Sequence, residues 1–198
     1  GADNPVAAGI ARFKDPGPEG VAARQAVEAA LALKNTEFNA QGVEMNQRYV
    51  SRAVMPDPAA GEEVWRRDPQ LHLQPTTRPG AKIPHAWLVD KRGIRVSTLD
   101  MTGKGCFSLV TGLAGGVWSD AVHELDLPYL RAVVIGQPGA ADPYCGWQRI
   151  RELPEAGALL VRPDGYVAWR HAEPPADVAE ARERLAIALG AVLDKRLL

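Results

Sequence analysis

The chain has 198 residues, of which 46% are hydrophobic and 24% charged, enough for one domain with a full core and a docked segment. Its 23 basic and 24 acidic residues give a formal net charge of -1, which excludes nucleic acid and anionic membranes as default partners. No stretch has the length and apolarity of a membrane span, and the N-terminal residues lack the pattern of a secretion signal.

The two cysteines, Cys106 and Cys145, form neither a CxxC pair nor a metal-binding set. We therefore expect a reducing, cytoplasmic setting. Because the chain begins with Gly1 and not with methionine, we also expect a processed chain, a tag remnant or a piece of something longer.

The first part of the chain predicts a lead-in followed by a helix. Residues 1–20 are punctuated by proline and glycine, up to the point where Pro18 and Glu19 can open a helix. Apolar residues then recur near helical spacing from Val21 to Lys34. Their apolar stripe needs a partner.

The next part predicts a long connection. Residues 38–54 fit either a helix interrupted at Gly42 or an extended segment. Six prolines, from Pro56 to Pro84 inclusive, then exclude most regular structure. We expect a draped segment here, and the best internal boundary at residue 84.

After residue 84 the pattern changes to short apolar runs, turns and amphipathic helices. The expected elements are a hairpin of Ala86–Val89 and Val96–Leu99, a strand Cys106–Thr111, a helix Trp118–Leu125 and a strand Tyr129–Ile135.

A second hairpin and a final helix complete the pattern. Ala158–Val161 and Tyr166–Trp169 flank a Pro-Asp-Gly turn, which is typical of an antiparallel hairpin. Asp177 can cap a helix whose stripe runs from Val178 to Val192. The fold class is therefore α/β, and the order β-α-β-β-α with a mixed sheet is that of the thioredoxin core. We expect residues 85–198 to form this thioredoxin-like domain and residues 1–84 to be a connecting segment.

Redox chemistry of the thioredoxin type needs a reactive thiolate at the start of the first core helix. Residues 111–118, which hold that place, contain no cysteine. We expect Cys106 to be a small buried filler within its strand. The glycine-rich residues 112–116 are best explained by tight turns, with weak anion binding as the alternative.

No histidine has metal-ligand spacing: His72, His85, His123 and His171 lie far apart in the sequence. We expect His85 to make a structural hydrogen bond at the entry to the sheet. His123 fits a solvated helix position. Catalytic and metal residues are therefore not assigned.

A dense group of hydrogen-bonding side chains lies between residues 37 and 49. It is either an ordinary polar surface or a segment buried against another domain whose groups satisfy it. For the second alternative, the candidate domain-interface residues are Asn39, Gln41, Asn46, Gln47, Arg48, Tyr49 and His85.

Several of these motifs resemble a known family. The segments EFNAQGVEMNQRY (37–49), PHAWL (84–88), STLD (97–100) and LVRPDGYVAWR (160–170) are similar to the C-terminal part of flavin-dependent aromatic hydroxylases. The 2,4-dichlorophenol 6-monooxygenases are the most similar branch. The resemblance covers roughly residues 20 to 195.

The resemblance implies a parent monooxygenase in which NADPH supplies electrons to FAD and one oxygen atom is added ortho to a phenol hydroxyl. It also implies N-terminal FAD and substrate domains as partners within the same polypeptide. No residue here matches the flavin-binding motifs, so no catalytic or cofactor-binding residue is carried over. We expect a structural role, packing on the FAD domain and aiding a homodimer.

Two alternatives remain open. The chain can be a free-standing thioredoxin-like module, without redox activity, that binds a small ligand or a protein. A redox enzyme that uses one cysteine is the weaker alternative.

Overall fold

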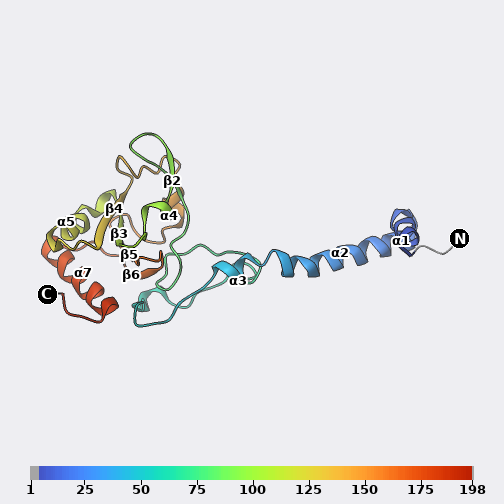
Figure 1. Cartoon of the computed structure of the whole chain (residues 1–198), viewed down its shortest axis with the longest axis horizontal. Helices are drawn as coiled ribbons and strands as arrows, with labels where there is room; N and C mark the ends of the chain where they lie inside the picture. Colours follow the sequence, from blue (N-terminus) through green and yellow to red (C-terminus); the bar gives the residue numbers. More distant parts are fainter. Residues whose placement is uncertain (1–4, 198) are drawn as a thin grey trace.

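The computed structural model describes residues 5–197, in which a long helical arm leaves a mixed α/β body (Figure 1). The arm consists of α1 (Pro5–Lys14) and α2 (Pro18–Phe38). Helix α2 begins at Pro18 as expected. The predicted lead-in is wrong for residues 5–14, which are helical, because proline is tolerated in a first helical turn and Ala7, Ala8 and Ala11 lie around Gly9. Residues 1–4 lie outside the described part.

The connection to the body contains one further short helix, α3 (Gln41–Met45). The expected interruption at Gly42 is wrong, since this glycine lies inside α3. A Cβ atom there would come within 2.0 Å of the Pro69 carbonyl oxygen, so glycine permits a close approach of two backbones. Between α3 and residue 84, the 3₁₀ turn η1 (Pro58–Ala60) is the one helical element, as the prolines predicted.

The body is built on a mixed sheet with the strand order β4-β3-β5-β6. Strand β3 (Phe107–Gly112) pairs in parallel with β4 (Leu130–Ile135) and antiparallel with β5 (Ala158–Val161). Strand β5 pairs antiparallel with β6 (Val167–His171). Helix α5 (Gly116–Leu125) joins β3 to β4. The predicted β-α-β unit and second hairpin are confirmed.

One face of the sheet is covered by α5 and by α7 (Val178–Leu193). The side chains of Trp118, Leu160 and Leu185 are fully buried in this layer. Asp177 caps α7 as predicted, since its carboxylate accepts the backbone N–H of Glu180 at 2.8 Å.

The opposite face is covered by a small hairpin and one short helix. The hairpin pairs β1 (Trp87–Val89) with β2 (Arg95–Ser97), and the helix is α6 (Gly146–Ile150). Leu88 and Trp147 pack here on residues of β3 and β5 that alternate with those of the first core. The first predicted hairpin is thus confirmed, although the sequence did not predict α6.

Two local predictions are wrong. Leu99 belongs not to a strand but to α4 (Thr98–Met101), which starts early because Ser97 and Asp100 form a capping box. Cys106 precedes β3 and is half-buried, so it is not a buried filler within the strand.

The end of the connecting segment lies along the outer edge of β6. The backbone N–H of Gly80 donates to the Val167 carbonyl at 2.8 Å, and that of Ile83 donates to the Gly165 carbonyl at 2.9 Å. Ala81 and Ile83 are buried in the core. These contacts cross the predicted boundary at residue 84, and the division itself stays a prediction.

Candidate functional site

The polar group at the end of the arm is folded onto the connecting segment. Asn46, which ends α3, uses its whole side-chain amide for this. Its Nδ2 donates to the carbonyl oxygens of Pro69 and His72, both at 2.8 Å, and its Oδ1 accepts the Gln74 N–H at 2.9 Å. One side chain therefore fixes both ends of the loop 69–74.

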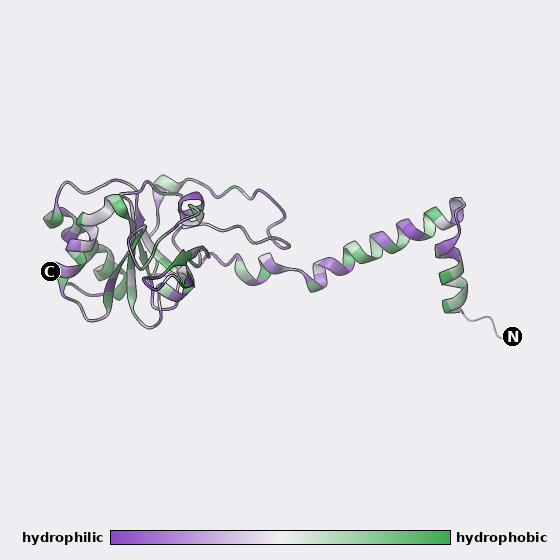
Figure 2. Ribbon diagram, turned by 90° about the horizontal axis from the view of Figure 1, so that it is seen from above, coloured by the Kyte–Doolittle hydropathy of each residue, from purple (hydrophilic) through white to green (hydrophobic). Residues whose placement is uncertain are grey.

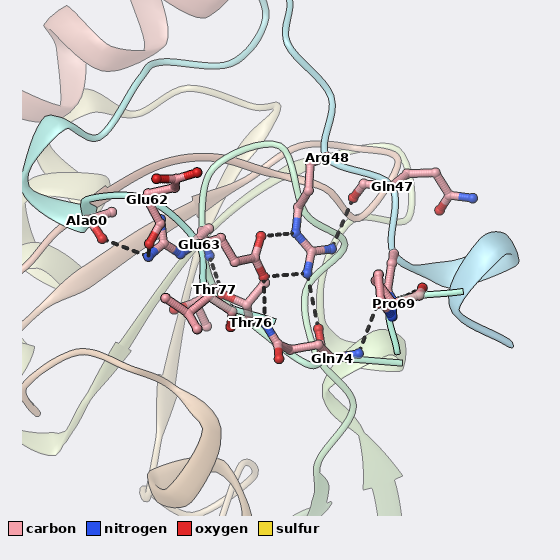
Figure 3. Close-up of polar contacts among 12 residues, drawn as sticks. Gln47, Arg48, Ala60, Glu62, Glu63, Pro69, Gln74, Thr76 and Thr77 are labelled. Atoms are coloured by element: carbon pink, nitrogen blue, oxygen red, sulfur yellow. Dashed lines mark hydrogen bonds and ion pairs between the residues drawn. The ribbon is translucent and has the colours of Figure 1, made fainter. Parts of the chain in front are cut away.

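Arg48 forms the centre of this junction (Figure 3). Its Nε and Nη2 donate to the two carboxylate oxygens of Glu63, each at 2.8 Å, the fork geometry that suits a guanidinium. The Gln74 side chain also donates to Glu63 at 3.0 Å. The face of Trp65 lies 5.0 Å from the Arg48 guanidinium carbon. Only 20% of the Arg48 side chain and 15% of the Glu63 side chain are exposed.

The charge of Glu63 is stabilised in the folded state. Burial acts to raise the pKa of Glu63, but hydrogen bonds from Arg48 and Gln74, with the charges of Arg48 and Arg78, outweigh it. The folded-state pKa of Glu63 therefore lies below its ordinary value of 4.5. This contribution to stability is present above that value and is lost as the pH falls through the folded-state pKa.

Replacing Glu63 by glutamine tests this linkage. Since glutamine does not titrate, we expect the Glu63→Gln variant to be less stable than wild type at neutral pH. The difference in free energy of unfolding should shrink as the pH falls below 4.5. Urea unfolding at a series of pH values measures it. A difference that stays constant down to pH values where wild type begins to unfold would contradict the assignment.

A second set of charges ties the connecting segment to β6, and we call it the Arg170 clasp: Arg170, Asp57, Glu152, Thr76 and Thr77. The Arg170 guanidinium donates to Asp57 at 2.5 Å and to Glu152 at 3.3 Å, with 9% of its side chain exposed. The Glu152 carboxylate also accepts the Thr76 hydroxyl at 2.7 Å and the Thr77 N–H at 3.0 Å. The clasp therefore joins two places in the connecting segment to the loop at residue 152 and to β6.

An open groove of about 250 Å³ lies between the Arg48–Glu63 pair and the Arg170 clasp. Arg78 in its wall is already bonded, because it donates to the carbonyl oxygens of Ala60 and Gly61, both at 2.7 Å. The remaining walls are largely apolar, and Val50 is fully exposed. The groove therefore favours an apolar contact over an anionic ligand. Its apolar lining residues are Tyr49, Val50, Val54, Met55, Pro56, Ala60 and Pro79.

Two more of the predicted interface residues belong to this junction. Tyr49 contacts the ring of Tyr166 edge-on, with 4.8 Å between centroids, and its N–H donates to the Gly80 carbonyl at 2.9 Å. The Gln47 amide turns back onto α3 and donates to the Glu44 carbonyl. The four consecutive residues Asn46, Gln47, Arg48 and Tyr49 thus all take part in the junction.

Of the other three predicted interface residues, Asn39 and Gln41 lie apart from the junction, whereas His85 lines a small cavity together with Arg48 and Gln74. Asn39 ends α2 and Gln41 begins α3, and both are exposed. His85 lies beside the first hairpin, where its Nδ1 is 2.7 Å from the Ser97 hydroxyl and its ring contacts Trp87 edge-on. The expected structural hydrogen bond of His85 is confirmed. A role of all seven residues in a domain interface stays a prediction.

Several residues of the junction were missed from the sequence. Arg48 and Glu63 are 15 positions apart, and Arg170 and Asp57 are 113 apart. No periodicity links such pairs, because they meet through loops. Arg170 stands in a motif that carries the family resemblance, but nothing in the sequence identifies its partners.

Residues 5–197 hold no group of three His, Cys, Asp or Glu side chains placed to bind a metal ion. At the glycine-rich turn, the Gly112 N–H already donates to the Glu155 carbonyl, and a Cβ on Gly115 would lie 1.8 Å from the Thr111 hydroxyl. The turn is therefore closely packed at Gly112 and Gly115. Within the same range no helix combines the length and apolarity needed to cross a membrane.

Comparison with known proteins gives consistent matches. Residues 76–195 match the family described as aromatic-ring hydroxylase, C-terminal. The chain is 47% identical over 165 residues to the 2,4-dichlorophenol 6-monooxygenase of Delftia acidovorans and 46% identical over 176 residues to that of Cupriavidus pinatubonensis. The matches cover 81% and 86% of this chain.

The fold is also similar to a solved structure, that of the flavin-dependent monooxygenase PieE in complex with FAD and substrate. The TM-score is 0.78 with 40% identity, and the superposition covers 94% of this chain and 32% of PieE. The chain spans only 28% and 29% of the two curated relatives. Because the family match covers more than half of the chain at these identities, the chain belongs to the family of aromatic-ring hydroxylase C-terminal domains.

Proposed function

We propose that this chain is the C-terminal portion of an FAD-dependent phenol monooxygenase of the 2,4-dichlorophenol type, which uses NADPH for ortho-hydroxylation. The observation that carries the proposal is the 47% identity to a 2,4-dichlorophenol 6-monooxygenase over 81% of this chain. The superposition on an FAD-bound monooxygenase supports FAD as the cofactor of that enzyme.

Within that enzyme the chain has a structural role. The glycine-rich turn supports this role, since the Gly112 N–H is bonded to the Glu155 carbonyl and a Cβ on Gly115 would meet Thr111. FAD and the phenol therefore bind to the preceding domains, on which this portion packs. Which phenol is used depends on those domains.

In the same proposal the sheet domain, residues 85–198, is thioredoxin-like without the redox cysteines. The strand order β4-β3-β5-β6, with one parallel pair and two antiparallel pairs, supports this assignment. Residues 1–84 form the connecting segment, and its polar junction around Arg48 stabilises the approach to the flavin domain. The two free cysteines support a reducing cytoplasm. The domain also contributes to a homodimer.

The test compares this chain with the intact polypeptide. We expect the intact polypeptide to purify with bound FAD and to couple NADPH oxidation to hydroxylation of 2,4-dichlorophenol. The 198-residue chain alone should do neither. FAD bound stoichiometrically by this chain alone would overturn the structural role, and an intact polypeptide without FAD would overturn the parent activity.

A further inference from the structure

The helical arm is exposed along nearly its whole length. Of the 21 residues of α2, only Gly20 is buried. The large apolar side chains stay in solvent: Leu31 is 65% exposed, Leu33 76% and Phe38 76%. The arm leaves the body in Figure 1, and Figure 2 shows hydrophobic and hydrophilic residues alternating along its length. Such a helix gains no stability from this chain's own core.

The apolar residues of α2 form two stripes. Val27, Leu31 and Phe38 share one side of the helix, at the spacing i, i+4, i+11. Ala22, Ala26 and Leu33 repeat this spacing five positions earlier, and at 100° per residue the second stripe lies roughly 140° from the first. The polar residues Gln25, Glu28 and Asn35 lie on the remaining side, which also carries the half-exposed Val21.

Helix α1 adds a third apolar surface. Val6, Ile10 and Phe13 recur at helical spacing and are 67%, 52% and 42% exposed. The angle between the two helices is held because Arg24 donates to the carbonyl oxygens of Phe13 and Asp15, both at 2.8 Å. An open groove of about 700 Å³ remains between α1 and α2. It is lined by Gly9, Arg12, Phe13, Glu19, Ala22, Ala23, Ala26 and Val27.

Because the two apolar stripes lie on different sides of α2, they indicate what kind of partner covers the helix. A helix that pairs with a second copy of itself needs one apolar seam and leaves the other side wet. Helix α2 instead presents apolar side chains on two sides, with Lys34 and Glu37 between them, so a single partner helix cannot cover both stripes. The arm therefore fits burial between two layers better than a dimer seam.

The superposition on PieE also favours a larger body, and not a second copy, as the partner of the arm. It leaves out 6% of this chain, about 12 residues, which is fewer than the 21 of α2. Most of the arm thus superposes on residues of PieE, and the remaining 68% of PieE lies outside the match. That remainder is large enough to cover the arm.

We infer that residues 5–38 are an internal element of the flavin-binding portion, and that the polypeptide preceding this chain covers both stripes of α2. This inference rests on the proposed function. It places a contact between the two portions on the arm.

The experiment introduces one charge on each stripe, in the intact flavin-carrying polypeptide and in the 198-residue chain. Leu31→Glu tests the first stripe, Leu33→Glu the second, and Gln25→Glu on the polar side is the matched control. In the intact polypeptide we expect each leucine variant to lower the Tm by about 4 °C or more, and the control by less than about 1 °C. In the 198-residue chain all three should shift the Tm by less than about 1 °C.

Other results would overturn the inference. A Tm shift from only one leucine variant would mean that one stripe stays in solvent. No shift from either would mean that the arm stays exposed, and equal shifts in the 198-residue chain would mean that its own residues or a second copy cover it. Sedimentation of that chain as a dimer, dissociated by either variant, would identify the second copy.

Two further measurements complete the test. If a glutamate variant of the intact polypeptide is insoluble, Leu31→Ala and Leu33→Ala give the same comparison with smaller shifts. FAD content and hydroxylation are measured separately on the unmodified intact polypeptide. Their absence would reject the proposed function, whereas the Tm comparison reports on the arm alone.

Discussion

Replacing Arg170 by methionine is expected to lower the free energy of unfolding by about 3 kcal/mol. Methionine keeps much of the side-chain volume but removes the charge that faces Asp57 and Glu152. Those carboxylates are only 18% and 37% exposed, so each loses a partner that water replaces incompletely. Urea unfolding of the two proteins at neutral pH measures the change.

The matched control is Arg92→Met. Arg92 also pairs with an aspartate, Asp90, but its side chain is 78% exposed, and such pairs contribute little. We expect a change of less than about 0.5 kcal/mol. Equal effects at positions 92 and 170 would show that the Arg170 clasp does not hold the connecting segment to β6.

Replacing Gly80 by alanine is expected to be the other large change. Gly80 has a φ of +89°, and a Cβ atom there would lie 2.3 Å from the Tyr49 carbonyl oxygen. The substitution therefore adds a steric clash to the strain of a positive φ, and it disturbs the hydrogen bond from the Tyr49 N–H to the Gly80 carbonyl. The junction and the edge of the sheet should separate locally.

Gly93→Ala separates the two causes. Gly93 has a similar φ of +79°, but its Cβ would meet nothing within 4 Å. We expect it to cost about 1 kcal/mol from strain alone, and Gly80→Ala to cost about 2 kcal/mol more. If the two variants unfold at the same urea concentration, the close approach of residues 49 and 80 is not tight in solution.

The sequence by itself determined most of the sheet domain. Runs such as Leu130–Ile135 and the stripe of α7 are local patterns, and the turn at residues 162–165 has the residue types that its conformation needs. The sequence also predicted the family, because several short motifs occur in the same order as in flavin-dependent aromatic hydroxylases. The prediction at Gly42 failed because glycine is needed there for contact with a distant backbone atom, the Pro69 carbonyl oxygen, and not because of its neighbours in sequence.

Only the tertiary structure decided how the connecting segment is held. Arg48 pairs with Glu63, and Arg170 pairs with Asp57 and Glu152. The loops that bring these residues together have no sequence periodicity, so no pattern in the sequence could predict the pairs. The exposure of the arm is likewise a tertiary fact. An apolar stripe predicts that a helix packs against a partner. Only the tertiary structure shows that residues 5–197 leave the large apolar side chains of α2 exposed.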